Sequence, residues 1–185
     1  MTDETLLIRR ILDGHPDDYR QLMLRYGDMI MDFIGSIVGS REDAEELTQN
    51  TFVNAYRSLS TYDRRKASLA TWLCRIAYHE TVRHVKRKRP PVISLDDDSQ
   101  LVDEAVDREA EEWLTHVTEQ RIQLLEEAIG QLSDYDQTLL RLYYKEDLPL
   151  KEIAFILDSE AARLANRLQR IRNRLYRMIK NKTTI

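Results

Sequence analysis

The stretch from Ser68 to Arg89, SLATWLCRIAYHETVRHVKRKR, constrains the fold of this chain more than any other. In its first half, apolar residues recur at i, i+3, i+4 and i+7, which places their side chains on one side of an α-helix. Past Ala77 the apolar residues move to the opposite side. We therefore expect a helix that is packed from both sides in the middle of its domain. The apolar residues are Leu69, Trp72, Leu73 and Ile76, followed by Tyr78, Val82 and Val85.

The same stretch ends in positive charge. Pro90 and Pro91 forbid the helix from continuing, so the charge gathers at its C-terminal end. This arrangement favours contact with a phosphate backbone. The cations are Arg83, Lys86, Arg87, Lys88 and Arg89.

The rest of the chain is also predicted to be helical. Its 185 residues include only five glycines and four prolines, and no run alternates apolar and polar residues as a strand does. No apolar run approaches the ~20 residues that span a bilayer, and the segment from Met1 to Leu12 is too charged for a signal peptide. Cys74 is the only cysteine, which excludes an intramolecular disulfide. We therefore expect a cytoplasmic protein without membrane insertion.

Charge is segregated along the chain, although the net charge is only -4. Acids crowd the stretch after Pro91, whereas no acid follows Ala161. We therefore expect two helical domains, residues 1–91 and 113–185, joined by an acidic linker at residues 92–112. The linker is either a solvated tether or a negative segment that avoids or imitates DNA inside a positively charged channel.

Within the first domain, apolar residues with a 3.6 period predict a short helix up to Gly14 and a second one from Pro16 to Gly39. Ser40 predicts the N-cap of a third helix, with Asp43 three residues further on. A polar connection then leads into the helix with the basic end. The buried side of the third helix is expected to consist of Leu47, Phe52, Ala55, Tyr56 and Leu59.

The opposite face of the third helix is polar and acidic. Such a face is more often solvated than bound to a protein, and the residues by themselves leave both interpretations open. Its members are Asp43, Glu46, Gln49, Asn50 and Val53.

The second domain is predicted to contain a helix-turn-helix. A helical pattern restarts at Trp113 and ends near Ser133, which together with Asp136 predicts another N-cap. After one more helix, the segment LPLKEIAFILDSEAARLANRLQRIRNRL predicts a short helix, a turn at residues 158–160 and a longer helix.

The longer helix carries an arginine stripe beside its leucine stripe. A helix in the major groove needs this arrangement, with one side packed on its own domain and the other facing bases and phosphates. A solvated arginine-rich surface or a coiled-coil strand are the alternatives, but the helix has no acids to pair with the arginines. The stripe therefore favours DNA contact. It consists of Arg163, Arg167, Arg170, Arg174 and Arg177.

The sequence gives little support for catalysis. Its histidines are scattered, and no second cysteine or carboxylate-histidine set stands at metal-ligand spacing. No segment resembles a glycine-rich phosphate loop or a nucleophile elbow. We therefore expect no enzyme, no cofactor and no metal site.

Three segments together resemble those of a bacterial RNA polymerase sigma factor of the extracytoplasmic-function group. GSREDAEELTQNTF, ending at Phe52, resembles the family's DAEDLxQxxF helix. TWLCRIA, ending at Ala77, resembles its TWLxxIA helix, and the segment from Leu150 to Leu175 resembles its EIAxxLGxxxGTVxSRLxRAR motif. The resemblance implies an all-α fold, with a four-helix sigma-2-like domain and a helix-turn-helix sigma-4-like domain joined by a linker.

The resemblance also implies what each segment binds. The first binds the clamp helices of the polymerase's largest subunit, through Asp43, Glu46, Leu47, Gln49, Asn50 and Phe52. The second, with a loop before it that holds a base turned out of the stack, engages the minus-ten promoter element through Tyr62, Arg64, Arg65, Lys66, His79, Arg83, Lys86 and Arg87. The third reads the minus-thirty-five element through Ala162, Arg163, Asn166, Arg167 and Arg170. The flap of the second-largest subunit and an anti-sigma factor are further implied partners.

This chain departs from the family pattern at several positions. Where the family usually has Asn and Asp on the minus-ten helix, it has His79 and Arg83. In the helix-turn-helix, Asp158 and Ala162 replace the usual glycines, and Arg163 replaces a threonine. We therefore expect changed sequence preferences at both promoter elements.

The hypothesis is therefore a sigma factor that binds core polymerase, directs it to promoters and helps melt the minus-ten element. One alternative is a conventional helix-turn-helix regulator that binds duplex DNA without core polymerase. Another is a nucleic-acid enzyme, which would require a metal constellation that the sequence does not indicate.

Overall fold

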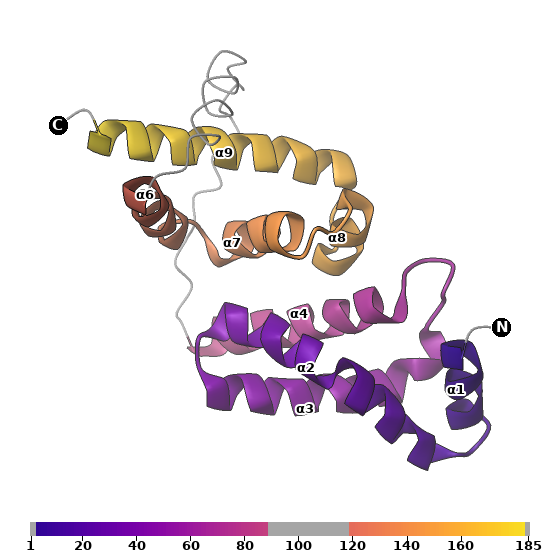
Figure 1. Ribbon diagram of the computed structural model, residues 1–185. Helices are drawn as coiled ribbons and strands as arrows, with labels where there is room; N and C mark the ends of the chain where they lie inside the picture. Colours follow the sequence, from indigo (N-terminus) through magenta and orange to yellow (C-terminus); the bar gives the residue numbers. More distant parts are fainter. Residues whose placement is uncertain (1–2, 89–118, 184–185) are drawn as a thin grey trace. The chain divides into compact units, whose positions relative to one another are not determined.

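The computed structural model describes residues 3–88 and 119–183, and all regular structure in these two ranges is helical. The chain divides into two compact units, one made chiefly of Met1–Val92 and the other chiefly of Ile93–Ala154 with Ser159–Ile185 (Figure 1). The predicted all-α class is confirmed. The acidic linker, Arg89, Trp113 and Val117 lie outside the described residues. Within those residues, no helix is long and apolar enough to cross a membrane.

Residues 3–88 of the N-terminal unit form four α-helices. They are α1 (Asp3–Leu12), α2 (Tyr19–Val38), α3 (Arg41–Ser58) and α4 (Leu69–Lys88), with short 3-10 helices at Pro16–Asp18 and Leu59–Thr61.

The boundaries of these helices follow from their capping residues. Gly39 ends α2 with a positive φ of 70°, a conformation that glycine adopts without steric cost. Ser40 then caps α3, because its Oγ accepts a hydrogen bond from the Asp43 amide. Ser68 Oγ likewise accepts from the Thr71 amide in the first turn of α4. The predicted cap at Ser40 is therefore confirmed.

Helices α2, α3 and α4 pack against one another and enclose the core of this unit. The central helix α4 is buried on both sides, as predicted, since Leu69 and Leu73 are inside on one side and Tyr78 and Thr81 on another. Cys74 is buried and forms no disulfide. The expectation that Tyr56 is buried is wrong. Its ring packs edge-on against Tyr19, at 5.0 Å between centroids, but 44% of the residue stays exposed.

The C-terminal unit is built from α6 (Glu119–Gly130), α7 (Asp134–Leu140), α8 (Leu150–Leu157) and α9 (Ala161–Thr183). A π-helical segment, Arg141–Lys145, prolongs α7. Helix α9 packs on both α6 and α7. The predicted cap at Ser133 and the helix-turn-helix formed by α8 and α9 are confirmed. The apolar stripe of α9 is buried along its length, with Leu164, Leu168, Ile171, Leu175 and Ile179.

The turn between α8 and α9 contains a residue in the left-handed conformation. Asp158 has a φ of 55°, at a position where the sigma-factor pattern carries glycine. Left-handed backbone costs most L-residues about 1–2 kcal/mol, and aspartate is one of the few that tolerate it. Asp158 therefore adopts a left-handed conformation of the kind that glycine also adopts.

We predict that Asp158→Ala will be less stable than Asp158→Gly by about 1 kcal/mol, because alanine has a Cβ that strains the left-handed backbone. Both variants lose the carboxylate, so their difference isolates the backbone term. Chemical denaturation of the two variants measures it. Equal stabilities would contradict the assignment of a strained turn.

Candidate nucleic-acid and protein interfaces

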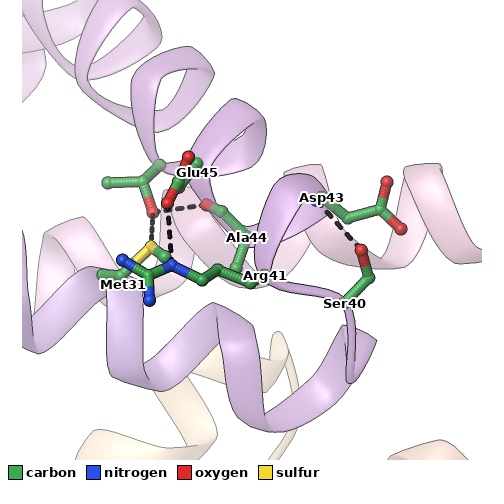
Figure 2. Close-up of polar contacts among 7 residues, drawn as sticks. Met31, Ser40, Arg41, Asp43, Ala44 and Glu45 are labelled. Carbon is green, nitrogen blue, oxygen red and sulfur yellow. Dashed lines mark hydrogen bonds and ion pairs between the residues drawn. The ribbon is translucent and has the colours of Figure 1, made fainter.

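The outer face of α3 is a polar stripe that remains in solvent. Glu46, Gln49, Asn50 and Val53 recur at i, i+3, i+4 and i+7, and all four are exposed. Figure 2 shows how the start of this helix is fixed by the Ser40 cap, at 3.3 Å, and how Arg41 pairs with Glu45, at 3.0 Å. A rigid helix therefore presents hydrogen-bonding groups along one side.

Two residues predicted to bind polymerase are buried in this structure. Leu47 and Phe52 are each 3% exposed. Tyr19 of α2 donates a 2.7 Å hydrogen bond to the Phe52 carbonyl and packs edge-on against its ring. Burial raises the pKa of this tyrosine. Leu47 and Phe52 therefore hold α3 in place, and the exposed face belongs to their neighbours.

Asp43 connects α3 to the basic end of α4. Both of its carboxylate oxygens lie 2.7 Å from the Lys88 ammonium, and His84 Nε2 lies 3.4 Å from one of them. The hydrogen bond from Lys88 lowers the pKa of the Asp43 carboxyl. No local sequence pattern indicates this ion pair, because its partners are far apart in the chain and meet only through packing of α3 on α4.

The loop between Leu59–Thr61 and α4 contains the predicted base-capturing residues. The Tyr62 ring lies 5.5 Å from the Trp72 ring, and its hydroxyl donates to the Ala67 carbonyl at 3.3 Å. Burial raises the pKa of this tyrosine. Arg64 and Lys66 are both exposed, and Arg64 donates to Thr5 Oγ1 of α1 at 3.2 Å. The loop is therefore a folded element that packs on both α1 and α4.

The cations of α4 differ in their environment. His79 is half-buried, and Arg83 pairs with Glu80 at 3.1 Å. Lys86 and Arg87, one turn further on, are exposed. The C-terminal end of α4 therefore presents positive charge to solvent, as predicted.

The exposed side of α9 begins at its N-terminal end. Ala162, Arg163 and Asn166 are exposed there, and Arg170 is half-exposed. Arg167 is held differently, because its Nε donates to the Asp136 carboxylate at 2.6 Å.

Arg167 therefore has an internal structural contact besides its predicted DNA contact. Its guanidinium also lies 4.7 Å above the centre of the Tyr135 ring. Asp136 belongs to the cap of α7, where it also accepts a hydrogen bond from Ser133 Oγ at 2.9 Å. The ion pair thus fastens the first half of α9 to the start of α7. Within residues 3–88 and 119–183, no group of three or more His, Cys, Asp or Glu is arranged to hold a metal ion.

We predict that Lys88→Gln will raise the pKa of the Asp43 carboxyl toward its ordinary value, whereas Lys86→Gln will leave it unchanged. An NMR titration of the aspartate side chains measures both. Because the pKa of Asp43 is lowered in the folded state, the ion pair stabilises the protein above the ordinary aspartate pKa, and this contribution is lost as the pH falls from there through the lowered pKa of the folded state. An unchanged Asp43 pKa in Lys88→Gln would show that the pair is absent in solution.

Comparison with known proteins identifies the family. Residues 22–90 match the model for Sigma-70 region 2. ECF RNA polymerase sigma factor SigM of Bacillus subtilis is 30% identical over 151 residues, which cover 81% of this chain and 88% of that protein. SigW of the same organism is 26% identical over 184 residues, covering 94% of this chain and 95% of the relative.

Solved structures agree on the fold. CnrH, in a complex with the cytosolic domain of CnrY, matches with a TM-score of 0.62 at 19% identity, over 95% of this chain and 96% of that one. The sigma factor RpoE of Bartonella quintana, in a complex with the anti-sigma factor NepR, matches with a TM-score of 0.58 at 19% identity, over 88% of this chain and 97% of that one. With the motifs in α3, α4 and the helix-turn-helix, the similarity to SigM places the chain in the extracytoplasmic-function group of RNA polymerase sigma factors.

Proposed function

We propose that this chain binds core RNA polymerase, directs it to specific promoters and helps to melt the minus-ten element. The observation that carries the proposal is the arrangement of the N-terminal unit. One packed set of helices presents the polar face of α3 together with the folded loop and the basic end of α4. The proposed polymerase-binding face and the proposed DNA-binding face therefore belong to one compact unit.

Polymerase binding is assigned to α3, toward the clamp helices of the largest subunit. Glu46, Gln49 and Asn50 supply exposed hydrogen-bonding groups, while the buried Leu47 and Phe52 fix their orientation. Asp43 likewise stabilises the position of α3, because it pairs with Lys88 of α4. Direct contact with polymerase is thus assigned to the residues that face solvent.

Minus-ten binding is assigned to the loop and to α4. Turning a base out of the stack costs a few kcal/mol, which stacking and cationic contacts offset. Tyr62 and the adjacent cations line the loop, and Lys86 and Arg87 extend the positive surface along α4. His79 and Arg83 lie between these groups in the chain, so they are assigned to base preference.

Minus-thirty-five binding is assigned to the N-terminal end of α9. The first residues of a recognition helix are those that meet base edges in the major groove. Ala162, Arg163 and Asn166 are exposed at this end, with Arg170 one turn further on. Arg167 is assigned to a supporting part, because its guanidinium is engaged by Asp136 and Tyr135.

The remaining partners follow from the same assignment. Residues 113–185, as a sigma-4-like domain, would contact the flap of the second-largest subunit, and residues 1–91 would form the sigma-2-like domain. Polymerase would supply the bond-forming chemistry, in the cytoplasm. An anti-sigma factor is a further proposed partner, in line with the complexes that the structurally similar CnrH and RpoE form.

We predict that the double variant Gln49→Ala with Asn50→Ala will retain less core polymerase than the unaltered chain, because it removes two exposed hydrogen-bonding groups from α3. Gln123→Ala, an exposed substitution on α6, is the matched control. Co-purification with core enzyme measures the effect. If the unaltered chain does not retain core enzyme and instead binds a specific duplex tightly, it acts as a conventional regulator and the proposal is wrong.

We predict that two arginines of α9, one turn apart, differ in what their removal affects. Arg163→Ala should weaken initiation at promoters that need the upstream element, by about 1–3 kcal/mol if the side chain contacts a base, and change stability by less than about 0.5 kcal/mol. Arg167→Ala should lower the free energy of unfolding by about 1–2 kcal/mol, because it leaves the mostly buried Asp136 carboxylate without its positively charged partner. Run-off transcription and chemical denaturation separate the two. Equal stability of both variants would contradict the supporting part of Arg167.

A further inference from the structure

Asp63 is the acid of the promoter loop, defined here as residues 62–68, and it binds the neighbouring Arg65 closely. The Arg65 guanidinium donates to both carboxylate oxygens, with Nε 3.0 Å from Oδ1 and a terminal nitrogen 2.9 Å from Oδ2. The Arg65 backbone amide donates to Oδ1 as well, at 3.0 Å. These hydrogen bonds lower the pKa of the Asp63 carboxyl to about 2.

The backbone of the loop is organised by the same residue. The Asp63 carbonyl accepts a hydrogen bond from the Lys66 amide at 2.9 Å, which closes a turn. Together with the side-chain bond to the Arg65 amide, this fixes the path of the chain from residue 63 to residue 66. Asp63 therefore determines where the cations of the loop lie.

Arg64 is held from the other side by α1. Its guanidinium donates to Thr5 Oγ1, and the first turn of α1 is itself fastened to α2. Asp3 pairs with Arg25 at 3.0 Å, and Glu4 accepts a hydrogen bond from the Tyr26 hydroxyl. Arg64 is therefore held by a segment of α1 that is itself bonded to α2.

Lys66 is in a different situation. All three cations of the loop are exposed, but the Lys66 side chain forms no hydrogen bond or ion pair within the part of the chain that the structure describes, although its charge helps to lower the pKa of Asp63. A phosphate can therefore approach this ammonium without displacing another partner.

We infer that Asp63 is a positioning residue that keeps Arg65 in the loop, and that Lys66 is the loop cation that contacts a phosphate of the minus-ten element. This inference rests on the proposed function. If Arg65 turned to DNA, the Asp63 carboxylate would be left unpaired beside phosphates, which repel it. The Asp63 and Arg65 pair carries no net charge, so it contributes no counterion release, whereas a Lys66 contact does.

The test uses the full chain reconstituted with core polymerase, on a promoter found by genome-wide run-off mapping with the unaltered chain. Permanganate reactivity of the minus-ten thymines reports open complex as a function of KCl concentration. Lys66→Gln should flatten the salt dependence by about 0.7 in logarithmic slope, the value for one phosphate contact on single-stranded DNA. The double variant Asp63→Asn with Arg65→Gln should keep the slope of the unaltered chain. Arg20→Gln, an exposed change on α2, is the control.

A slope that flattens in the double variant as much as in Lys66→Gln would overturn the inference, because Arg65 would then contact phosphate. An unchanged slope in Lys66→Gln would overturn it as well. Failure of the unaltered chain to form any open complex with core polymerase would instead overturn the proposed function, and the Lys66 assignment with it.

Two further measurements test the positioning role of Asp63, hydrogen exchange in the free chain and open-complex formation with core polymerase. Asp63→Ala should speed hydrogen exchange of the Arg65 amide and lower open-complex formation at every salt concentration, because the turn loses its acceptor. Asp63→Asn keeps a side-chain oxygen that can accept from the Arg65 amide. It should therefore restore most of the protection of that amide and most of the open-complex formation. Equal exchange of the Arg65 amide in Asp63→Ala and in the unaltered chain would show that Asp63 does not organise the loop.

Discussion

The close packing of α4 between α2 and α3 is the contact on which the N-terminal unit depends. Ala55, Ala77, Thr51 and Thr81 are all completely buried, and their small size lets the helix backbones approach. The two threonine hydroxyls donate to carbonyls one turn earlier, Leu47 at 2.7 Å and Ala77 at 2.8 Å, so burying them leaves no donor unsatisfied. The two proposed binding faces, on α3 and on the promoter loop with α4, belong to helices that pack in this core. A larger side chain at one of these positions would cost about 1–3 kcal/mol, because the closely packed helices leave no room for it.

Ion pairs then decide which charged groups remain available at the surface. Asp43 with Lys88, Asp63 with Arg65 and Asp136 with Arg167 each join a residue of a family motif or loop to a partner of opposite charge. The first and third pairs connect different helices, whereas the second shapes a loop. Charges that lie outside such pairs are the ones that a phosphate or a partner protein meets first. A count of basic residues therefore overestimates the number of cations that face DNA.

Local patterns in the sequence predicted most of the fold, because helix periodicity, caps and turn residues act over four or five positions. The caps at Ser40 and Ser133 and the helix-turn-helix are of this kind. The pairs of Asp43 with Lys88 and of Arg167 with Asp136 join residues 45 and 31 positions apart. Such contacts depend on how whole helices pack, which no local pattern encodes. Periodicity predicted the buried position of Leu47. The family motif by itself does not distinguish residues that contact polymerase from buried residues that hold them in place.

The burial of Cys74 has a practical consequence for studying the motions of this protein. It is the only thiol of the chain and is 8% exposed within the core of the N-terminal unit. A maleimide dye therefore reacts much faster with a cysteine introduced at an exposed position than with the native one. Single-site fluorescent labelling of the promoter loop or of the exposed face of α9 is thus feasible in the otherwise unaltered chain. Energy transfer between two such labels would follow its conformational changes during initiation.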